Sequence, residues 1–453
     1  MAVIPQELID VVLSNLDPVQ DRDSLKCIAL SAYNLAVPAQ RTLFRSLSLH
    51  AGSKRETSTF ERALTLFTQS PHLTPYVRDL DIGMPWPEQQ AFLSRILPLV
   101  TRVRRFVIQG CGVPWRMLSP ALQTALYDFT SRPALQKLHL IFISGIPASF
   151  ISLAARRVPV LSMQDLVVAP DPDDFQLHCC EVEERPPKLT DLTLSLYFKN
   201  PWDTLRELGL TPTIERLALD MDDSDDVLDA ITAVAPTIRH LELTSIAQLT
   251  PRPLPLSTPL ALPTMPNLTS LSICLPPEFN SLISPSRLSA LMANLSVAQS
   301  PFLRELTISI AWPVSARSAV GLPMAIAENS LGQEDMRRLL GKGNAEVLGA
   351  LDVFLSSSSS SASGASSSVH CTWDLLCDSG VSSTPTSPSS PTSPCTSAQK
   401  ISRTREPDGC GGYHARVFTL FKNTIEGCMP KTRARGKLEV RRSVRRGYLE
   451  GLA

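Results

Sequence analysis

The sequence predicts an α/β fold built from a repeated unit of one helix and one parallel strand. The first observation is a short recurring motif, a proline followed by apolar residues with polar residues between them, of which residues 236–244 are the clearest copy. The second is an amphipathic helical segment before many of the copies, which makes each helix the crossover between two parallel strands. The third is length, because 453 residues exceed one ordinary globular core and favour an elongated array.

The copies recur with a period similar to that of leucine-rich repeats. We use as a marker one inward-facing apolar residue of each copy. The markers are Leu80, Phe106, Leu138, Leu166, Leu192, Leu217, Leu241, Leu271 and Leu306. Successive markers lie 24 to 35 residues apart, against about 20 to 29 for leucine-rich repeats. The sequence therefore predicts a divergent solenoid over residues 50–355.

Helical periodicity marks several of the crossovers. The expected helices cover residues 59–69, 87–97, 120–129, 224–235 and 286–298. An alternation of this kind is also typical of a closed barrel, which would make the protein an enzyme. Barrel strands are buried on both faces and read as continuous apolar runs, whereas residues 191–195 and 239–244 alternate strictly. An open horseshoe, with helices on one side and a wet strand face on the other, is the expectation.

A small helical head is predicted at residues 1–49. A first helix opens at Pro5 and has Leu8, Val12, Leu13 and Leu16 on one face. A second helix begins near Asp23 or Ser24, where either side chain is a suitable N-cap. A third spans residues 37–44 and leads directly into a strand at residues 47–49.

These motifs resemble the F-box of fungal, mushroom-type F-box proteins. Residues 4–9 are similar to the family's opening motif, residues 25–31 to its central helix and residues 38–45 to its closing motif. The resemblance continues at residues 70–78 and 434–440, and it departs from the family at Leu35, where a Trp is usual. It implies a substrate receptor of a cullin ubiquitin ligase, bound to a Skp-type adaptor through Ile4, Pro5, Glu7, Leu8, Val12, Leu16 and Leu35. From the residues alone, the alternative is a head that only caps the open end of the array, in a repeat scaffold with no ligase role.

The wet strand face is the expected site for a protein target. Its residues alternate with the inward-facing ones and are Asp81, Val107, His139, Val167, Thr193, Ala218, Glu242, Ser272 and Thr307. They include no basic stripe and no aromatic ladder, so nucleic acid is not an expected partner. The candidate target-contacting residues are Asp81, His139, Thr193, Glu242 and Thr307.

No motif in the sequence points to catalysis, a cofactor or a metal. Phosphate loops, nucleophile elbows, dinucleotide fingerprints and metalloprotease helices are missing. The ten cysteines are scattered, and the His178, Cys179 and Cys180 cluster matches no zinc spacing. The aspartates of residues 220–229 lack the Gly and bidentate Glu of a calcium loop and are instead typical of a helix start. We therefore expect a non-catalytic binding protein.

Charge and hydropathy place the protein in solution. Lys plus Arg and Asp plus Glu both number 43, which gives no overall field for a nucleic acid or an acidic membrane. No apolar run approaches the roughly 18 residues of a spanning helix, so an intracellular protein is expected. The basic stretch at residues 431–446 is either a solvated end or a nuclear address, and the expected location is cytoplasmic, nuclear or both.

The last quarter contains a Ser/Pro-rich tract inside the array. Residues 356–412 include a run of six serines and four Thr-Pro or Ser-Pro pairs, candidate phosphorylation sites. Such a composition predicts disorder, interrupted by a short strand at residues 369–376. Residues 413–453 are expected to close the array with a helix at 413–428, a strand at 438–440 and a basic end. The tract is therefore an insertion rather than a linker.

Overall fold

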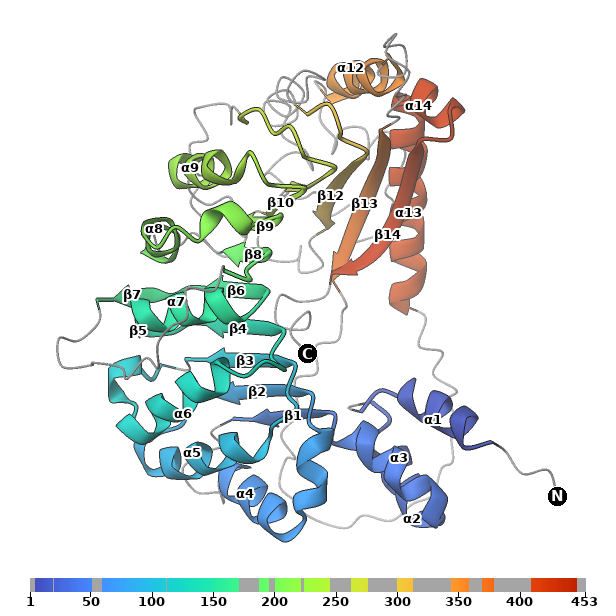
Figure 1. Cartoon of the computed structure of the whole chain (residues 1–453). Coiled ribbons are helices and arrows are strands. Elements are labelled where there is room, and N and C mark those ends of the chain that lie inside the picture. The colour runs from blue at the N-terminus through green and yellow to red at the C-terminus, as the bar shows by residue number, and fades with distance from the viewer. Residues whose placement is uncertain are drawn as a thin grey trace, which may run out of the picture. The chain divides into compact units, whose positions relative to one another are not determined.

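The computed structural model gives a mixed α/β fold with a large parallel sheet (Figure 1). It describes residues 5–18, 20–50, 59–110, 112–170, 187–194, 200–220, 224–244, 262–275, 300–312, 344–357, 369–378 and 409–445. The chain divides into two compact units, Met1–Leu241 and Glu242–Ala453. Each unit is described by itself below.

The sheet of the first unit follows chain order. Its strands are β1 Ser46–Leu49, β2 Asp79–Gly83, β3 Arg105–Gln109, β4 Lys137–Ile141, β6 Val160–Gln164, β8 Asp191–Leu194 and β9 Arg216–Asp220, with β10 His240–Thr244 at the unit boundary. Neighbours from β1 to β9 pair in parallel without a register shift. One row across the strands is formed by Leu47, Leu80, Phe106, Leu138, Leu161, Leu192 and Leu217. Apart from Leu47, every residue of this row is almost fully buried. The row therefore forms the centre of the hydrophobic core of the first unit.

The prediction that Leu166 is the marker of the fourth copy is wrong, because Leu161 occupies that position in the sheet. Leu161, in β6, pairs with Leu138 and Leu192. The chain then turns at Asp165, which has a positive φ of 51°. The next strand, β7 Val167–Ala169, pairs instead with β5 Ser144–Pro147 in a separate two-stranded sheet. Leu161 in β6 and Leu166 just before β7 are both buried leucines in largely apolar stretches, so the apolar pattern alone did not separate them.

The helices of the first unit precede the strands as crossovers. They are α4 Thr59–Gln69, α5 Gln90–Leu99, α6 Pro120–Thr130, α7 Ala148–Arg157, α8 Asn200–Glu207 and α9 Ser224–Val234. Short 3-10 turns accompany them at η1 Pro71–Tyr76, η2 Pro87–Gln89, η3 Trp115–Met117 and η4 Thr211–Thr213. Figure 1 shows the helices along one side of the strands. Four of the expected helices are present, whereas α7 and α8 were not predicted.

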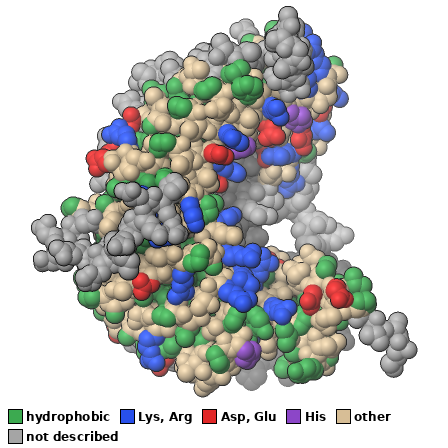
Figure 2. Space-filling model, in the orientation of Figure 1, with side chains coloured by type: hydrophobic (Ala, Val, Ile, Leu, Met, Phe, Trp, Pro, Cys, Tyr) green, Lys and Arg blue, Asp and Glu red, His purple; other side chains and the backbone are tan. Residues whose placement is uncertain are grey.

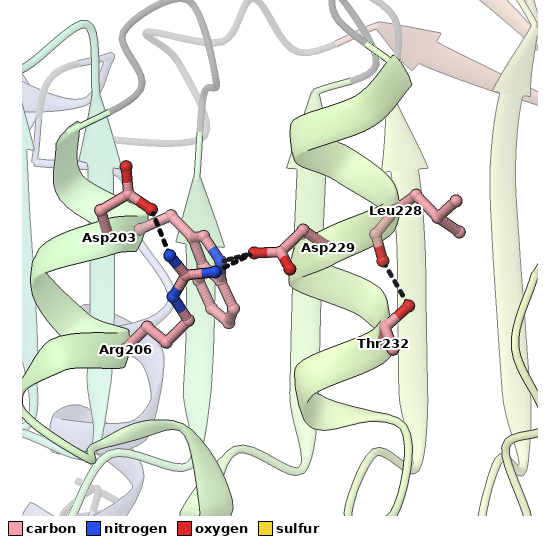
Figure 3. A network of polar contacts seen from close by, with 6 residues as sticks. Asp203, Arg206, Leu228, Asp229 and Thr232 are labelled. Atoms are coloured by element: carbon pink, nitrogen blue, oxygen red, sulfur yellow. Dashed lines mark hydrogen bonds and ion pairs between the residues drawn. The ribbon is translucent and has the colours of Figure 1, made fainter.

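A polar network ties α8 to α9 (Figure 3). The carboxylate of Asp229 accepts hydrogen bonds from Trp202 Nε1 at 3.1 Å and Arg206 Nη1 at 2.8 Å. Arg206 also donates to Asp203 on its own helix, at 3.2 Å. Calcium binding is the alternative that the sequence raises for the aspartates of residues 220–229. In the structure, Asp229 instead accepts hydrogen bonds from a guanidinium and an indole.

The head consists of three helices, α1 Gln6–Ser14, α2 Arg22–Ser31 and α3 Tyr33–Leu43. Its core is small, with Leu13, Leu25 and Ala39 buried at the centre. Ile9, Leu16, Ile28, Ala29 and Leu43 pack against them. The third helix begins four residues before the predicted start and includes Pro38. Proline has no N–H to donate to the carbonyl of Asn34, and that carbonyl instead accepts from Gln6 Nε2 of α1 at 3.4 Å.

The second unit contains the remaining strands, β11 Ser270–Leu275, β12 Glu305–Trp312, β13 His370–Asp378 and β14 Leu438–Arg445, paired in parallel in that order. Leu271, Leu306, Cys371 and Leu438 form one row. Its helices are α12 Asn344–Ser357, α13 Gly409–Cys428 and α14 Pro430–Ala434. The strand and helix expected after residue 368 are thus found close to their predicted positions. The helix predicted at 286–298 and most of the Ser/Pro-rich tract lie outside the described residues.

Candidate protein-binding sites

The head exposes many apolar side chains for its size. Those that are both large and exposed are Leu8, Val11, Val12, Leu30, Tyr33 and Val37. Leu30 is 88% and Tyr33 94% exposed, which for these side chains leaves almost the whole apolar surface in water. Hydrophobic side chains are visible at the surface in this part of Figure 2. Clustered exposure of this kind is typical of an interaction surface, whereas single exposed apolar residues are ordinary.

Two contacts show that α1 and α3 run side by side in the same direction. The hydrogen bond from Gln6 to the carbonyl of Asn34 joins their first turns. Thr42 Oγ1 donates to the carbonyl of Leu13 at 3.1 Å and joins their last turns. Leu8 of α1 therefore lies at about the level of Val37 of α3, whereas Val11 and Val12 lie nearer the last turns that Leu13 and Thr42 join. Leu30 is the last residue but one of α2 and lies three residues before Tyr33, the first residue of α3.

The predicted adaptor-binding residues divide into two groups. Glu7, Leu8 and Val12 are exposed on α1, and Pro5 is exposed at its N-cap. Leu16 and Leu35 are half-buried, and Leu16 packs on the core of the head. Ile4 lies outside the described residues. The expectation that Leu16 shares an adaptor-binding stripe with Leu8 and Val12 does not hold, because Leu16 lies just beyond the end of α1 and packs against the core of the head.

Sequence reasoning missed Val11, Leu30, Tyr33 and Val37. A helical wheel would have found Val11, since Leu8, Val11 and Val12 follow the i, i+3, i+4 spacing of one helix face. Leu30 and Tyr33 carry no such signal. They flank Ala32, whose extended backbone (φ −155°, ψ 142°) separates α2 from α3, and this turn was not predicted.

The strand face of the first unit brings three predicted target-contacting residues into one row. Paired residues across the strands are Ser48, Asp81, Val107, His139, Ser162, Thr193 and Ala218. Val107 is buried, and Asp81, His139 and Thr193 are half-buried. Ser162 occupies the position predicted for Val167, because β6 and not β7 pairs with β4 in this sheet. The row is mostly polar, but the prediction that Val107 lies on the wet face is wrong, because its side chain is buried.

Asp81 is held by its neighbours on this face. Gln109 Nε2 donates to Asp81 Oδ1 at 3.2 Å, and His50 Nε2 lies 3.5 Å from Oδ2. The hydrogen bond to Asp81 raises the pKa of His50, against the opposing effect of its burial. A carboxylate fixed in this way presents a defined acceptor rather than a mobile charge.

His139 has the least usual environment on the face. Both ring nitrogens are buried, and neither has a hydrogen-bond partner among the described residues; the same holds for Nη2 of Arg105 on the neighbouring strand. Burial, followed by the charges of Arg105 and Lys137, lowers the pKa of His139 to about 4. The imidazole is therefore neutral at pH 7 and offers one donor and one acceptor.

The other two predicted target-contacting residues lie further along the chain. Glu242 is half-buried in β10. Thr307, in the second unit, is half-buried in a row with Ser272, Thr372 and Glu439. Asp374, two residues beyond Thr372, accepts from Arg441 Nε at 3.1 Å and Ser443 Oγ at 2.7 Å. This face too is polar.

Within the described part of the chain, no group of three His, Cys, Asp or Glu side chains is arranged to hold a metal ion. The cluster at His178 lies outside that part. None of the helices described there combines the length and the apolar character needed to cross a membrane. Neither a protein-family model nor a curated protein sequence matches the chain.

Proposed function

We propose that this protein is the substrate-recognition subunit of a Skp-cullin-F-box ubiquitin ligase, with an F-box-like head and a leucine-rich-repeat-like solenoid. In this proposal the head binds a Skp-type adaptor and the strand face binds a protein target. The protein contributes no bond chemistry. It raises the rate of ubiquitin transfer by holding the target near the ligase, which replaces a bimolecular encounter with an intramolecular one.

The observation that carries the proposal is the exposed apolar surface of the head. A helical head that served only as a cap would bury its apolar side chains against the array and expose polar ones. Here Leu8 and Val12 of α1 remain 56% and 62% exposed, and Leu30 and Tyr33 of the same head are still more exposed. Covering such side chains with a partner is favourable by roughly 25 cal/mol per Å² of apolar area removed from water.

A second candidate, the repeat scaffold with a capping head, is favoured by one specific observation. The head continues into β1, which is the edge strand of the sheet and pairs with β2. Arg41 of α3 also lies over the ring of Tyr76 in η1, 5.8 Å from its centroid. The head thus packs on the first repeat, as a cap does. The two roles are compatible, because these contacts leave Leu8 and Tyr33 uncovered.

The test is co-purification of the full chain with the Skp-type adaptor of its host. We expect stoichiometric binding by the wild type and its loss in the double variant Leu8→Ser, Val12→Ser, and separately in Tyr33→Ser. Both variants replace exposed side chains, so the fold should persist. Far-UV circular dichroism and the thermal unfolding midpoint check this.

The matched control replaces Met117 and Phe142 with Ser. Both are large, exposed apolar residues of the first unit outside the head, and this variant should keep full adaptor binding. Absence of adaptor binding by a folded wild type would reject the ligase role and leave the scaffold. Equal losses in the head and control variants would show that binding follows general surface hydrophobicity.

A further inference from the structure

Three arginines occupy the same position on three neighbouring strands. Arg45, Arg78 and Arg104 each precede the first residue of a strand, in β1, β2 and β3 respectively. Their backbones are joined in sequence, since the Arg78 N–H donates to the Arg45 carbonyl at 2.8 Å and the Arg104 N–H to the Arg78 carbonyl at 2.7 Å. Adjacent strands lie about 4.8 Å apart. The three arginines are therefore neighbours at the N-terminal ends of these strands. We name these residues the arginine ladder.

The ladder carries an excess of positive charge. Arg102 adds a fourth guanidinium close by, and its carbonyl accepts from Arg78 Nη1 at 3.2 Å. Among the residues that the structure describes, the carboxylate in ion-pair contact with this group is Asp79, whose Oδ2 lies 3.8 Å from Arg45 Nε. Figure 2 shows a compact group of basic side chains on this part of the first unit.

This arrangement is unfavourable for the free protein. Like charges on neighbouring strands repel and lower stability. Partial burial, followed by the charges of Arg104, Arg102 and Arg45, lowers the pKa of Arg78. An anionic partner would relieve the repulsion, and guanidinium groups are well suited to it because they bind carboxylates with two parallel hydrogen bonds.

The positions of the aromatic side chains favour a protein over a nucleic acid as the partner. Single-stranded nucleic acids are usually bound with bases stacked on aromatic side chains. The ring of Tyr76, two residues before Arg78, is already covered by Arg41. Trp86 and Phe142 are exposed, but they follow β2 and β4 and so lie at the C-terminal ends of the strands, whereas the ladder lies at the N-terminal ends. A peptide segment rich in carboxylates fits the site better.

We propose that the arginine ladder is a docking site for an acidic segment, rich in Asp and Glu, of a protein partner. It is separate from the apolar surface of the head and from the row that contains Asp81 and His139. The proposal rests on the proposed function only where it identifies this partner with the protein target of the ligase. The segment would bind at the start of the strands, close to the end of α3.

The test measures fluorescence anisotropy of a labelled decaglutamate peptide with the full-length protein at low salt. We expect binding that weakens as salt rises, because exposed charge pairs are screened. The double variant Arg45→Gln, Arg104→Gln should bind about tenfold more weakly. The control variant Arg62→Gln, Arg95→Gln loses the same charge from exposed positions on α4 and α5 and should bind as the wild type does.

Four outcomes would overturn the proposal. They are no binding of decaglutamate by the wild type, an equal loss in the control variant, no loss in the ladder variant, and tighter binding of a labelled oligouridine than of decaglutamate. The last result would instead assign the ladder to nucleic acid. Adaptor co-purification with the same variants separates the two proposals: peptide binding without adaptor binding keeps the ladder site and rejects the ligase role, whereas the reverse rejects only the ladder site.

Discussion

Asp352 and Thr432, which lie 80 residues apart in the sequence, form a buried pair in the second unit. The carboxylate of Asp352 accepts from the Thr432 N–H at 2.6 Å and from its hydroxyl at 2.7 Å, and also from the Lys431 N–H at 3.1 Å. It thereby caps the short helix α14 from a residue of α12. The Ser/Pro-rich tract separates the two helices in sequence, so this contact joins the chain on either side of the tract.

Removal of this carboxylate should loosen the end of the chain. In Asp352→Ala the N–H groups of Lys431 and Thr432 lose their acceptor, and Thr432 is fully buried. An unsatisfied buried donor that had bonded to a charge costs about 2 to 3 kcal/mol. Hydrogen exchange should therefore accelerate in α14 and β14. Val353→Ala, at the exposed neighbouring position, is the control, and equal exchange in the two variants would contradict the prediction.

Gly110 should not tolerate a side chain. A Cβ at this position would lie 1.9 Å from the carbonyl oxygen of Phe142, and a backbone atom cannot rotate away. We expect Gly110→Ala to destabilise the first unit by about 3 kcal/mol, the upper end of overpacking costs. Gly112→Ala is the control, since its Cβ would meet nothing within 4 Å and only its positive φ of 80° is unfavourable. Urea unfolding followed by circular dichroism should show the smaller loss for Gly112→Ala.

His139 should make the protein sensitive to acid. Its pKa in the folded state is about 4, below the value of about 6.5 in an unfolded chain. The unfolded state therefore binds the proton more tightly, and stability falls as pH drops from about 6.5 to 4. In His139→Leu this loss should be reduced by up to about 3 kcal/mol. Unfolding free energies of both proteins at pH 7 and pH 4 measure the difference, and parallel pH profiles would refute the assignment.

His50 should have the opposite pH dependence. Its pKa is raised by the hydrogen bond to Asp81, so its contribution is complete below the unfolded value of about 6.5 and disappears as pH rises through the folded value. We expect His50→Gln to be less stable than the wild type at pH 5.5 and equally stable at pH 8.5. The effect should stay below about 1 kcal/mol because the pair is partly exposed. A histidine titration by NMR gives the folded pKa directly.

The strand register was largely predictable from the sequence. Leu80, Phe106 and Leu138 were markers in the sequence and are paired in the sheet. Side chains alternate between the two faces of a strand with period two, so a local pattern reports which face is buried. The apolar pattern failed at Leu166 because two strands follow each other there, each with a buried leucine in or just before it. The choice between them depends on which strand pairs with β4, and that is a long-range contact.

What the sequence by itself determined is therefore the kind of element and its buried face, for example the strand at Leu138 and the helix that contains Leu8. Only the tertiary structure decided which apolar residues of the head stay in water. Leu13 and Leu8 have the same chemistry, and they differ because α3 covers one of them. The arginine ladder is likewise a tertiary feature, because Arg45, Arg78 and Arg104 are distant in sequence and become neighbours through strand pairing. Local propensity acts within a few residues, whereas exposure and charge clustering depend on segments that the fold brings together.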